Sequence, residues 1–171
     1  MNKRYPIGEF SYNDDSFAAN KDKWIAEIER LPNDLAELVN DFNSRQLETS
    51  YRDGAWTVRQ IVHHIADSHM NSYIRFRWAI TENEPTIKAY DENDWAKLID
   101  AKNAPVELSL DLIKALHARW VWFLSELDAN DYNKSFVHPE SAEVVSLRQN
   151  LAYYAWHGQH HLAHIKIVKG F

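Results

Sequence analysis

Residues that interrupt regular structure are scarce in this chain: glycine occurs four times and proline five times in 171 residues. Tight turns depend on these two residue types, so their scarcity predicts a few long helices with few sharp turns between them. The apolar residues agree, because they recur every three or four positions in several long segments. We therefore expect an all-α protein built as a four-helix bundle.

The four expected helices cover most of the chain. The first should break or restart at Pro32, since proline suits a first helical turn but not a helix interior. The second opens with a capping box formed by Thr57 and Gln60, and the last opens with a similar pair, Ser146 and Gln149. The four helices are expected over residues 16–43, 57–81, 109–127 and 146–169.

Two stretches between these helices have other patterns. Residues 85–105 are expected to be irregular, with one short helix around 94–98. Residues 135–145 contain two short β-prone pieces around a turn-like centre, which predicts a small β-hairpin before the last helix. No repeat or flexible linker divides the chain, so we expect a single domain over residues 1–171.

Composition excludes several classes of function. The net charge is −6 and no run of Lys or Arg would follow a phosphate backbone, so no nucleic-acid partner is expected. No apolar run is long enough to span a membrane, and the first residues lack the apolar core of a signal peptide, so we expect a cytoplasmic protein without a membrane partner. The chain has no cysteine, so any metal ion must be bound by histidine and carboxylate side chains.

Histidines are concentrated on the last expected helix, which carries His157, His160, His161 and His164. Two imidazoles at i and i+4 can bind one ion from successive turns. At about 100° per residue, His157 and His161 lie nearest the apolar face, and His160 points further out. We therefore expect His157 and His161 as the ligand pair, and His160 as a peripheral residue.

A second concentration, His63, His64 and His69, lies on the helix that begins at Thr57. Two helices of a bundle can converge their imidazoles on one ion. Periodicity leaves the ligand open, because the apolar stripe passes through His69, whereas His64 belongs to an adjoining polar stripe that would suit a wet pocket. Histidines on helices are more often structural than ligands, and a pH-sensitive surface patch is the alternative.

Other residues are weaker candidates for a binding pocket. Arg52, Arg59, Arg75 and Arg77 could bind a carboxylate-bearing substrate, although exposed arginines on helices usually form only surface pairs. His138, in the expected hairpin turn, could reach the mouth of the pocket.

Two segments resemble the signature helices of the DinB-like superfamily: Gly-Ala-Trp-Thr-Val-Arg-Gln-Ile-Val-His-His-Ile-Ala-Asp-Ser-His-Met-Asn at 54–71 and Tyr-Ala-Trp-His-Gly-Gln-His-His-Leu-Ala-His-Ile at 154–165. Tyr5-Pro-Ile-Gly8 and Phe136-Val-His-Pro-Glu140 also resemble its YfiT-like branch. That branch is described as candidate metal-dependent hydrolases and includes bacillithiol S-transferases. The resemblance covers nearly the whole chain.

The resemblance implies a four-helix bundle that binds one divalent ion per chain through three histidines. Matched residue by residue, the ligands are His64, His157 and His161, which decides between His64 and His69. The next-best set would be His64 with His160 and His164. The remaining histidines then become pocket candidates, and we expect His69 to be buried and hydrogen-bonded without touching the ion.

Three neutral imidazoles leave the double charge of the ion and open coordination positions, as in catalytic sites. Zinc is the default ion; nickel, iron and manganese are alternatives. The resemblance implies an S-transferase that activates a small bacillithiol-type thiol as a metal thiolate and conjugates it to an electrophile.

Two other functions remain open. One is a metal-dependent hydrolase that uses a metal-bound hydroxide on a hydrolysable substrate, with Asp67 or a pocket histidine as general base. The other is a non-catalytic metal-binding stress protein. The resemblance also implies a homodimer, which would bury part of the large aromatic content.

Overall fold

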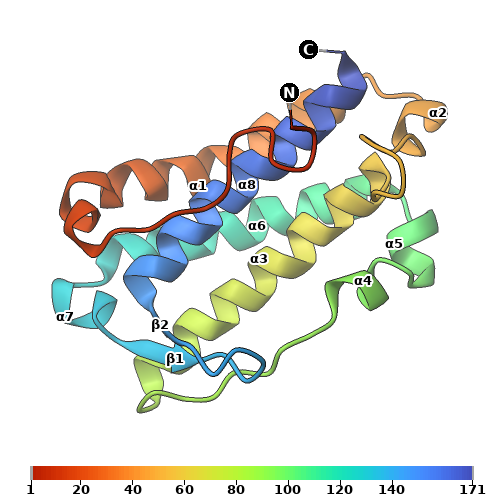
Figure 1. The fold of residues 1–171 in the computed structure, drawn as a ribbon. Helices are drawn as coiled ribbons and strands as arrows, with labels where there is room; N and C mark the ends of the chain where they lie inside the picture. Colours follow the sequence, from red (N-terminus) through yellow and green to blue (C-terminus); the bar gives the residue numbers. More distant parts are fainter. Residues whose placement is uncertain (1, 171) are drawn as a thin grey trace.

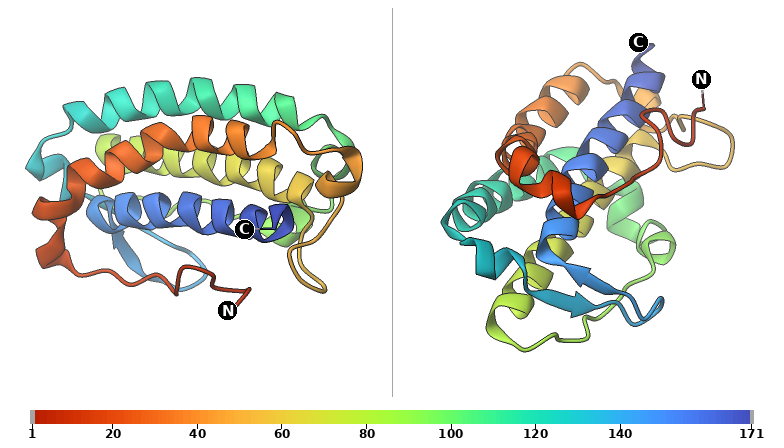
Figure 2. Two further views of the ribbon diagram at one scale, coloured as in Figure 1. Left: turned by 90° about the horizontal axis from the view of Figure 1, so that it is seen from above. Right: turned by 60° about the vertical axis from the view of Figure 1, so that its left-hand side comes forward.

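The fold is a four-helix bundle with a short β-hairpin, as expected from the sequence (Figure 1). A computed structural model describes residues 2–170. Helix α1 packs against α6 and α8, and α3 packs against the same two helices, so the four enclose one elongated core (Figure 2). The long helices are α1 (Phe17–Val39), α3 (Val58–Thr81), α6 (Val106–Glu126) and α8 (Leu147–Lys169).

Short elements connect the long helices. Strands β1 (Ser135–Val137) and β2 (Val144–Ser146) pair antiparallel and lead into α8, which confirms the expected hairpin. Residues 85–105 contain two short helices where the sequence predicted one, because Asp91 caps the first and the second packs against α3. The short helices are η1 (Asp14–Ser16), α2 (Ser44–Leu47), α4 (Glu92–Trp95), α5 (Ile99–Asn103) and α7 (Ala129–Tyr132).

Helix α1 continues through Pro32, so the predicted break there is wrong. Proline has no amide hydrogen, and the carbonyl of Ile28, four residues earlier, therefore lacks its helical donor. The ring of His117 on α6 supplies a replacement, since its Nδ1 lies 2.6 Å from that oxygen. A hydrogen bond between α6 and α1 thus replaces the hydrogen bond that Pro32 removes from within α1.

The helix ends follow local sequence with small differences from expectation. Thr57 and Gln60 form the predicted capping box at the start of α3. Ser146 accepts a bond from the Gln149 amide, but the return bond of the second box is not among those found in residues 2–170. Helix α6 begins directly after Pro105, three residues before its expected start, because a proline is tolerated there.

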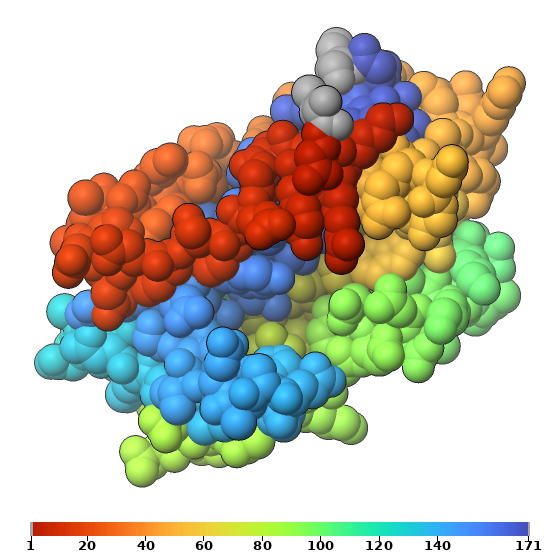
Figure 3. Space-filling view, viewed as in Figure 1, coloured from red at the N-terminus to blue at the C-terminus, as the bar shows by residue number. Residues whose placement is uncertain are grey.

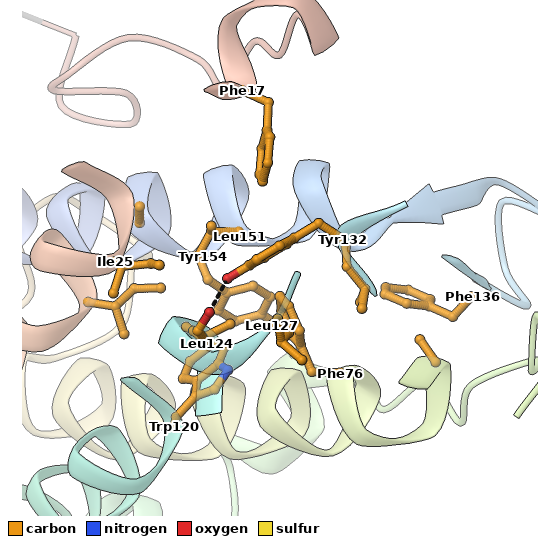
Figure 4. Packing of buried hydrophobic residues seen from close by; sticks show 14 of the residues in the cluster. Phe17, Ile25, Phe76, Trp120, Leu124, Leu127, Tyr132, Phe136, Leu151 and Tyr154 are labelled. Atoms are coloured by element: carbon orange, nitrogen blue, oxygen red, sulfur yellow. Dashed lines mark hydrogen bonds between the residues drawn. The ribbon is translucent and has the colours of Figure 1, made fainter. Parts of the chain in front are cut away.

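The apolar core forms two clusters along the bundle. The first lies toward the hairpin, where Phe76, Trp120 and Tyr154 pack between α3, α6 and α8 (Figure 4). The hydroxyl of Tyr132 donates to the carbonyl of Leu124 at 2.6 Å and closes this end. The second cluster comprises Leu31, Leu35, Leu38, Val39, Val58, Ile61, Val62, Ile65, Val106, Ile113, Leu162 and Ile165.

Buried histidines occur on three helices where the two clusters meet, although His63 and His64 lie among residues of the second cluster on α3. On α6, His117 lies between Ile113 and Trp120, and on α8 the histidines follow Tyr154 and continue to the turn of Leu162. The two apolar clusters therefore bound a buried polar layer from which a site can be built.

Among residues 2–170, no helix is both long enough and apolar enough to cross a membrane.

Candidate metal centre

Three histidines from two neighbouring helices meet in the buried polar layer. His64 comes from α3, and His157 and His161 come from successive turns of α8. The Nε2 atom of His157 lies 3.2 Å from Nε2 of His64 and 3.2 Å from Nε2 of His161. Ligand nitrogens of all three residues lie within 4.8 Å of one another. The fold thus brings together the three residues predicted as ligands.

The spacing of these nitrogens suits one small divalent ion. Histidine nitrogens bind such ions at about 2.0–2.1 Å. If two nitrogens that lie 3.2 Å apart are each bound at about 2.0–2.1 Å from the ion, the angle between them at the ion is about 100°, close to tetrahedral. The group found within residues 2–170 contains only these three side chains. Three neutral nitrogen ligands leave room for an exogenous ligand, as in catalytic sites.

Burial keeps these imidazoles neutral. It lowers the pKa of His64 to about 4, and it lowers the pKa values of His157 and His161 well below the ordinary 6.5, with repulsion from neighbouring histidines as a smaller cause. A neutral imidazole has one nitrogen with a free lone pair, which is the form that binds metal ions. The site is therefore ready to bind a cation at neutral pH.

The other ring nitrogens of the α8 pair contact further histidines. Nδ1 of His157 lies 3.2 Å from Nε2 of His69, and Nδ1 of His161 lies 3.4 Å from Nδ1 of His164. His69 is fully buried and also contacts His117 at 3.0 Å. The predicted burial and hydrogen bonding of His69 are confirmed, and its position outside the ligand set stays a prediction.

Aromatic rings fix the surroundings of the histidines. The His64 ring packs on Trp56 at 4.6 Å between centroids. His160 is buried, so its expected peripheral position is wrong. It stacks on Trp156 at 4.5 Å, and Tyr5 lies 5.9 Å from it. Residues before α1 therefore cover the face that helical periodicity alone left exposed.

A cavity of about 560 Å³ opens beside the three histidines. Residues before η1, the loop before α3, the segment leading into α4 and the hairpin turn surround it, and Figure 3 shows the hollow between these parts. His138 lies in its lining, as the sequence indicated. The charged residues in the lining are Arg4, Arg52, Arg75, Glu92 and Glu140.

Two of the four arginines singled out in the sequence reach the cavity. Arg52 and Arg75 line it, and the Nε atom of each is buried without a hydrogen-bond partner within residues 2–170. Arg59 instead bonds Glu48 at 2.6 Å. Arg77 does not line the cavity and has a cation–π contact with the ring of Phe123. The cavity therefore has two arginines in its lining, and their positive charge could attract an acidic group.

Asp67 is not brought to the cavity. It is half-buried on α3, one turn after His64, and is not among the lining residues. Burial, with a smaller contribution from the negative charge of Asp100, raises its pKa to about 6. That value would suit a general base, but the position does not support contact with a substrate, and the role of Asp67 stays a prediction.

Sequence reasoning missed two contributors. His117 was not among the predicted site residues, although it lies on the apolar stripe of its helix with Ile113 and Trp120, which is a signal of burial. The sequence assigned no contact with the histidines to the segment before η1, yet the carbonyl of Arg4 lies 3.2 Å from Nε2 of His164. Nothing in the local pattern indicates that this segment returns to α8.

Comparisons with known proteins agree with the fold and the histidine group. Residues 27–165 match the model of the DinB superfamily. A protein of Oceanobacillus iheyensis is 54% identical over 165 residues, covering 96% of this chain and 95% of that protein. A protein of Bacillus mycoides is 54% identical over 166 residues, covering 97% and 95%. Both are named as candidate metal-dependent hydrolases.

Solved structures extend the comparison. YfiT from Bacillus subtilis, described as a candidate metal-dependent hydrolase with an unusual four-helix bundle topology, matches with a TM-score of 0.96 and 45% identity over 99% of this chain and 97% of that one. The four-helix bundle protein TT2238 shares the fold, with a TM-score of 0.55 and 20% identity over 83% of this chain and 94% of its own. Fold, histidine group and sequence identity together show that the chain belongs to the DinB superfamily.

Proposed function

We propose that this protein is a metal-dependent enzyme that conjugates a low-molecular-weight thiol of the bacillithiol type to an electrophile. The observation that carries the proposal is the convergence of three buried, neutral imidazoles beside a cavity of about 560 Å³. His64, His157 and His161 would bind one divalent ion, zinc by default and nickel as the alternative. The names of the relatives support a metal-dependent enzyme.

When bound, the ion would supply a positive centre that favours the deprotonated form of a thiol. The three imidazoles carry no charge, so they leave that positive charge uncompensated. The guanidinium groups of Arg52 and Arg75, which line the cavity, would bind an acidic group on the thiol or the electrophile. The sulfur would form a bond to the electrophilic carbon as the bond from that carbon to its leaving group, such as a halide, breaks; the leaving group departs with the bonding electron pair, and the thiol proton passes to solvent.

Conjugation fits the described residues better than hydrolysis does. A metal ion would deprotonate a bound thiol outright, whereas it would lower the pKa of a bound water only to about 7, so hydrolysis gains more from a general base. Of the two bases expected from the sequence, Asp67 lies outside the cavity lining, whereas the pocket histidines His138, His160 and His164 lie in it. A chain without cysteine is compatible with a thiol that is brought in as a substrate. We place the enzyme in the cytoplasm, where small thiols are kept reduced.

Hydrolysis is the second candidate, and the names of the close relatives favour it. In this alternative, a histidine of the cavity or Asp67 would accept a proton from water. The pKa of Asp67, raised to about 6, would match that role if a substrate-bound form brought its carboxylate to the cavity.

A parallel assay of both reactions tests the proposal. Zinc-loaded and chelator-treated protein are compared with N-acetylcysteine and bacillithiol as thiols, a fluorogenic alkyl halide as electrophile, and nitrophenyl esters as hydrolysable substrates. Conjugation that needs the metal supports the transferase. Metal-dependent ester cleavage without conjugation supports the hydrolase, and metal binding without either reaction supports a non-catalytic metal-binding protein.

Cobalt substitution gives an independent test of where the thiol binds. A thiol that reaches the ion should produce a sulfur-to-cobalt charge-transfer band. The band should be lost in His161→Ala, which removes a proposed ligand, and kept in Lys166→Ala, an exposed position on the same helix. A band that survives in His161→Ala would contradict the proposed ligand set.

A further inference from the structure

Pro32 leaves one carbonyl of α1 without its helical donor. In an uninterrupted helix the amide of residue 32 would donate to the carbonyl of Ile28, but proline has no amide hydrogen. Nδ1 of His117 lies 2.6 Å from that oxygen. A carbonyl can only accept, so His117 carries its proton on Nδ1, and in the neutral ring Nε2 can then only accept.

Two contacts of His69, one with His117 and one with His157, extend this order of donors and acceptors to a proposed ligand. Nε2 of His117 lies 3.0 Å from Nδ1 of His69, so His69 donates from Nδ1 and keeps a bare Nε2. That nitrogen lies 3.2 Å from Nδ1 of His157. His157 therefore also donates from Nδ1, and its free lone pair is on Nε2, the nitrogen that faces His64.

A second, shorter chain reaches the other ligand of α8. Nε2 of His164 lies 3.2 Å from the carbonyl oxygen of Arg4, which can only accept. His164 therefore has a bare Nδ1, which lies 3.4 Å from Nδ1 of His161. The lone pair of His161 is then left on Nε2, the nitrogen that faces His157.

We propose that these two hydrogen-bond chains, each ending on a backbone carbonyl, fix the tautomers of His157 and His161 so that both present Nε2 to one ion. His69 and His117 are positioning residues that act through His157, and Pro32 creates the acceptor on which their chain ends. The inference rests on the metal ligation proposed above, but it requires no particular reaction. Partners that donate to or accept from ligand histidines commonly set ring orientation and metal affinity.

Ring-nitrogen NMR of the zinc-loaded protein tests the proton positions directly. His69, His117 and His157 should each carry the proton on Nδ1, and His164 should carry it on Nε2. The same spectra of chelator-treated protein should show His117 and His164 unchanged, because their acceptors are backbone carbonyls. A proton on Nε2 of His117 would overturn the longer chain.

Paired variants separate positioning from simple support of the fold. His117→Leu removes the donor to Ile28 and the acceptor for His69, and we expect zinc affinity to fall about tenfold to a hundredfold, measured against a competing chelator. Adding Pro32→Ala returns an amide to residue 32, which can donate to the Ile28 carbonyl again. The double variant should therefore regain thermal stability while zinc binding stays weak.

The outcomes are distinct even if His117→Leu alone does not fold. Zinc affinity within about twofold of wild type in the folded double variant would show that His117 only satisfies the carbonyl, and would overturn the proposal. His117→Gln, whose amide can donate and accept, should keep more zinc affinity than His117→Leu. If the tautomers are as stated but no thiol is conjugated, the proposed function fails and this inference stands.

Discussion

Gly158 of α8 lies so close to Leu31 of α1 that a Cβ atom added to Gly158 would stand 2.7 Å from Cδ2 of Leu31. Leu31 is 1% exposed, so its side chain cannot swing into solvent to make room. Gly158 also directly follows His157, one of the proposed ligands. The glycine therefore sets how closely α1 and α8 pack beside the metal centre.

Gly158→Ala should destabilise the protein. Alanine favours a helix over glycine by up to about 1 kcal/mol, but overpacking of a filled core costs about 1–3 kcal/mol. Because the 2.7 Å approach is too close for a Cβ atom, we expect a cost in the upper part of that range and a net loss of about 1–2 kcal/mol in urea unfolding. Leu31→Ala in the same chain should relieve the contact. The double variant should therefore lose less unfolding free energy than the two single variants lose in sum. A Gly158→Ala protein as stable as wild type would contradict this packing.

Asp67 should lower stability once it ionises. Its pKa is raised from 3.8 to about 6, chiefly by burial and secondarily by Asp100. Between these values the folded state binds more protons than the unfolded state, so the contribution of Asp67 to stability falls as pH rises from about 4 to 6. Asp67→Asn should therefore match wild type near pH 4 and exceed its melting temperature near pH 7.

The Asp67 comparison is best made with both proteins treated with chelator, because metal occupancy itself depends on pH. The buried histidines titrate in both proteins, so their effect cancels in the difference between the two melting temperatures. A difference in melting temperature that stays constant from pH 4 to pH 7 would show that burial does not perturb this carboxyl.

Helix α6 carries an apolar stripe on its outer face, and we propose that it forms a homodimer interface. Leu108, Leu112 and Trp122 are 63%, 44% and 68% exposed and lie within one side of the helix. Figure 2 shows α6 on the side of the bundle away from the segment that precedes η1. Exposed apolar patches of this kind are typical of protein interfaces.

Light scattering at micromolar concentration should give the mass of a dimer. Trp122→Lys should shift that mass to a monomer, because it replaces the most exposed of the three large apolar side chains with a charge. Arg119→Ala, on the same side of the helix but without a large apolar side chain, serves as the control. A monomer mass for wild type would refute the interface.

Regular patterns predicted much of this structure. The four long helices followed from apolar periodicity, and the proximity of His157 and His161 followed from their i, i+4 spacing. Both features depend on residues close in sequence, and helix geometry alone relates such residues in space. The β-hairpin was indicated in the same way, by local residue preferences.

Features that depend on distant segments were not predictable from local pattern. His64 and His69 both point from α3 into the bundle. Only the positions of α6 and α8 decide that His64 approaches His157 and that His69 contacts His117. Pro32 was expected to break α1 because its compensating donor is on α6. His160 was expected at the periphery because the covering residue, Tyr5, lies 155 positions away in sequence.

The central claim is that His64, His157 and His161 bind one divalent ion through Nε2. The most direct measurement is an anomalous difference map from crystals of zinc-loaded protein, collected on both sides of the zinc absorption edge. We predict one peak per chain, at about 2.0–2.2 Å from the three Nε2 atoms. A peak bound by His160 and His164 in place of the α8 pair, or no peak at the triad, would contradict the account.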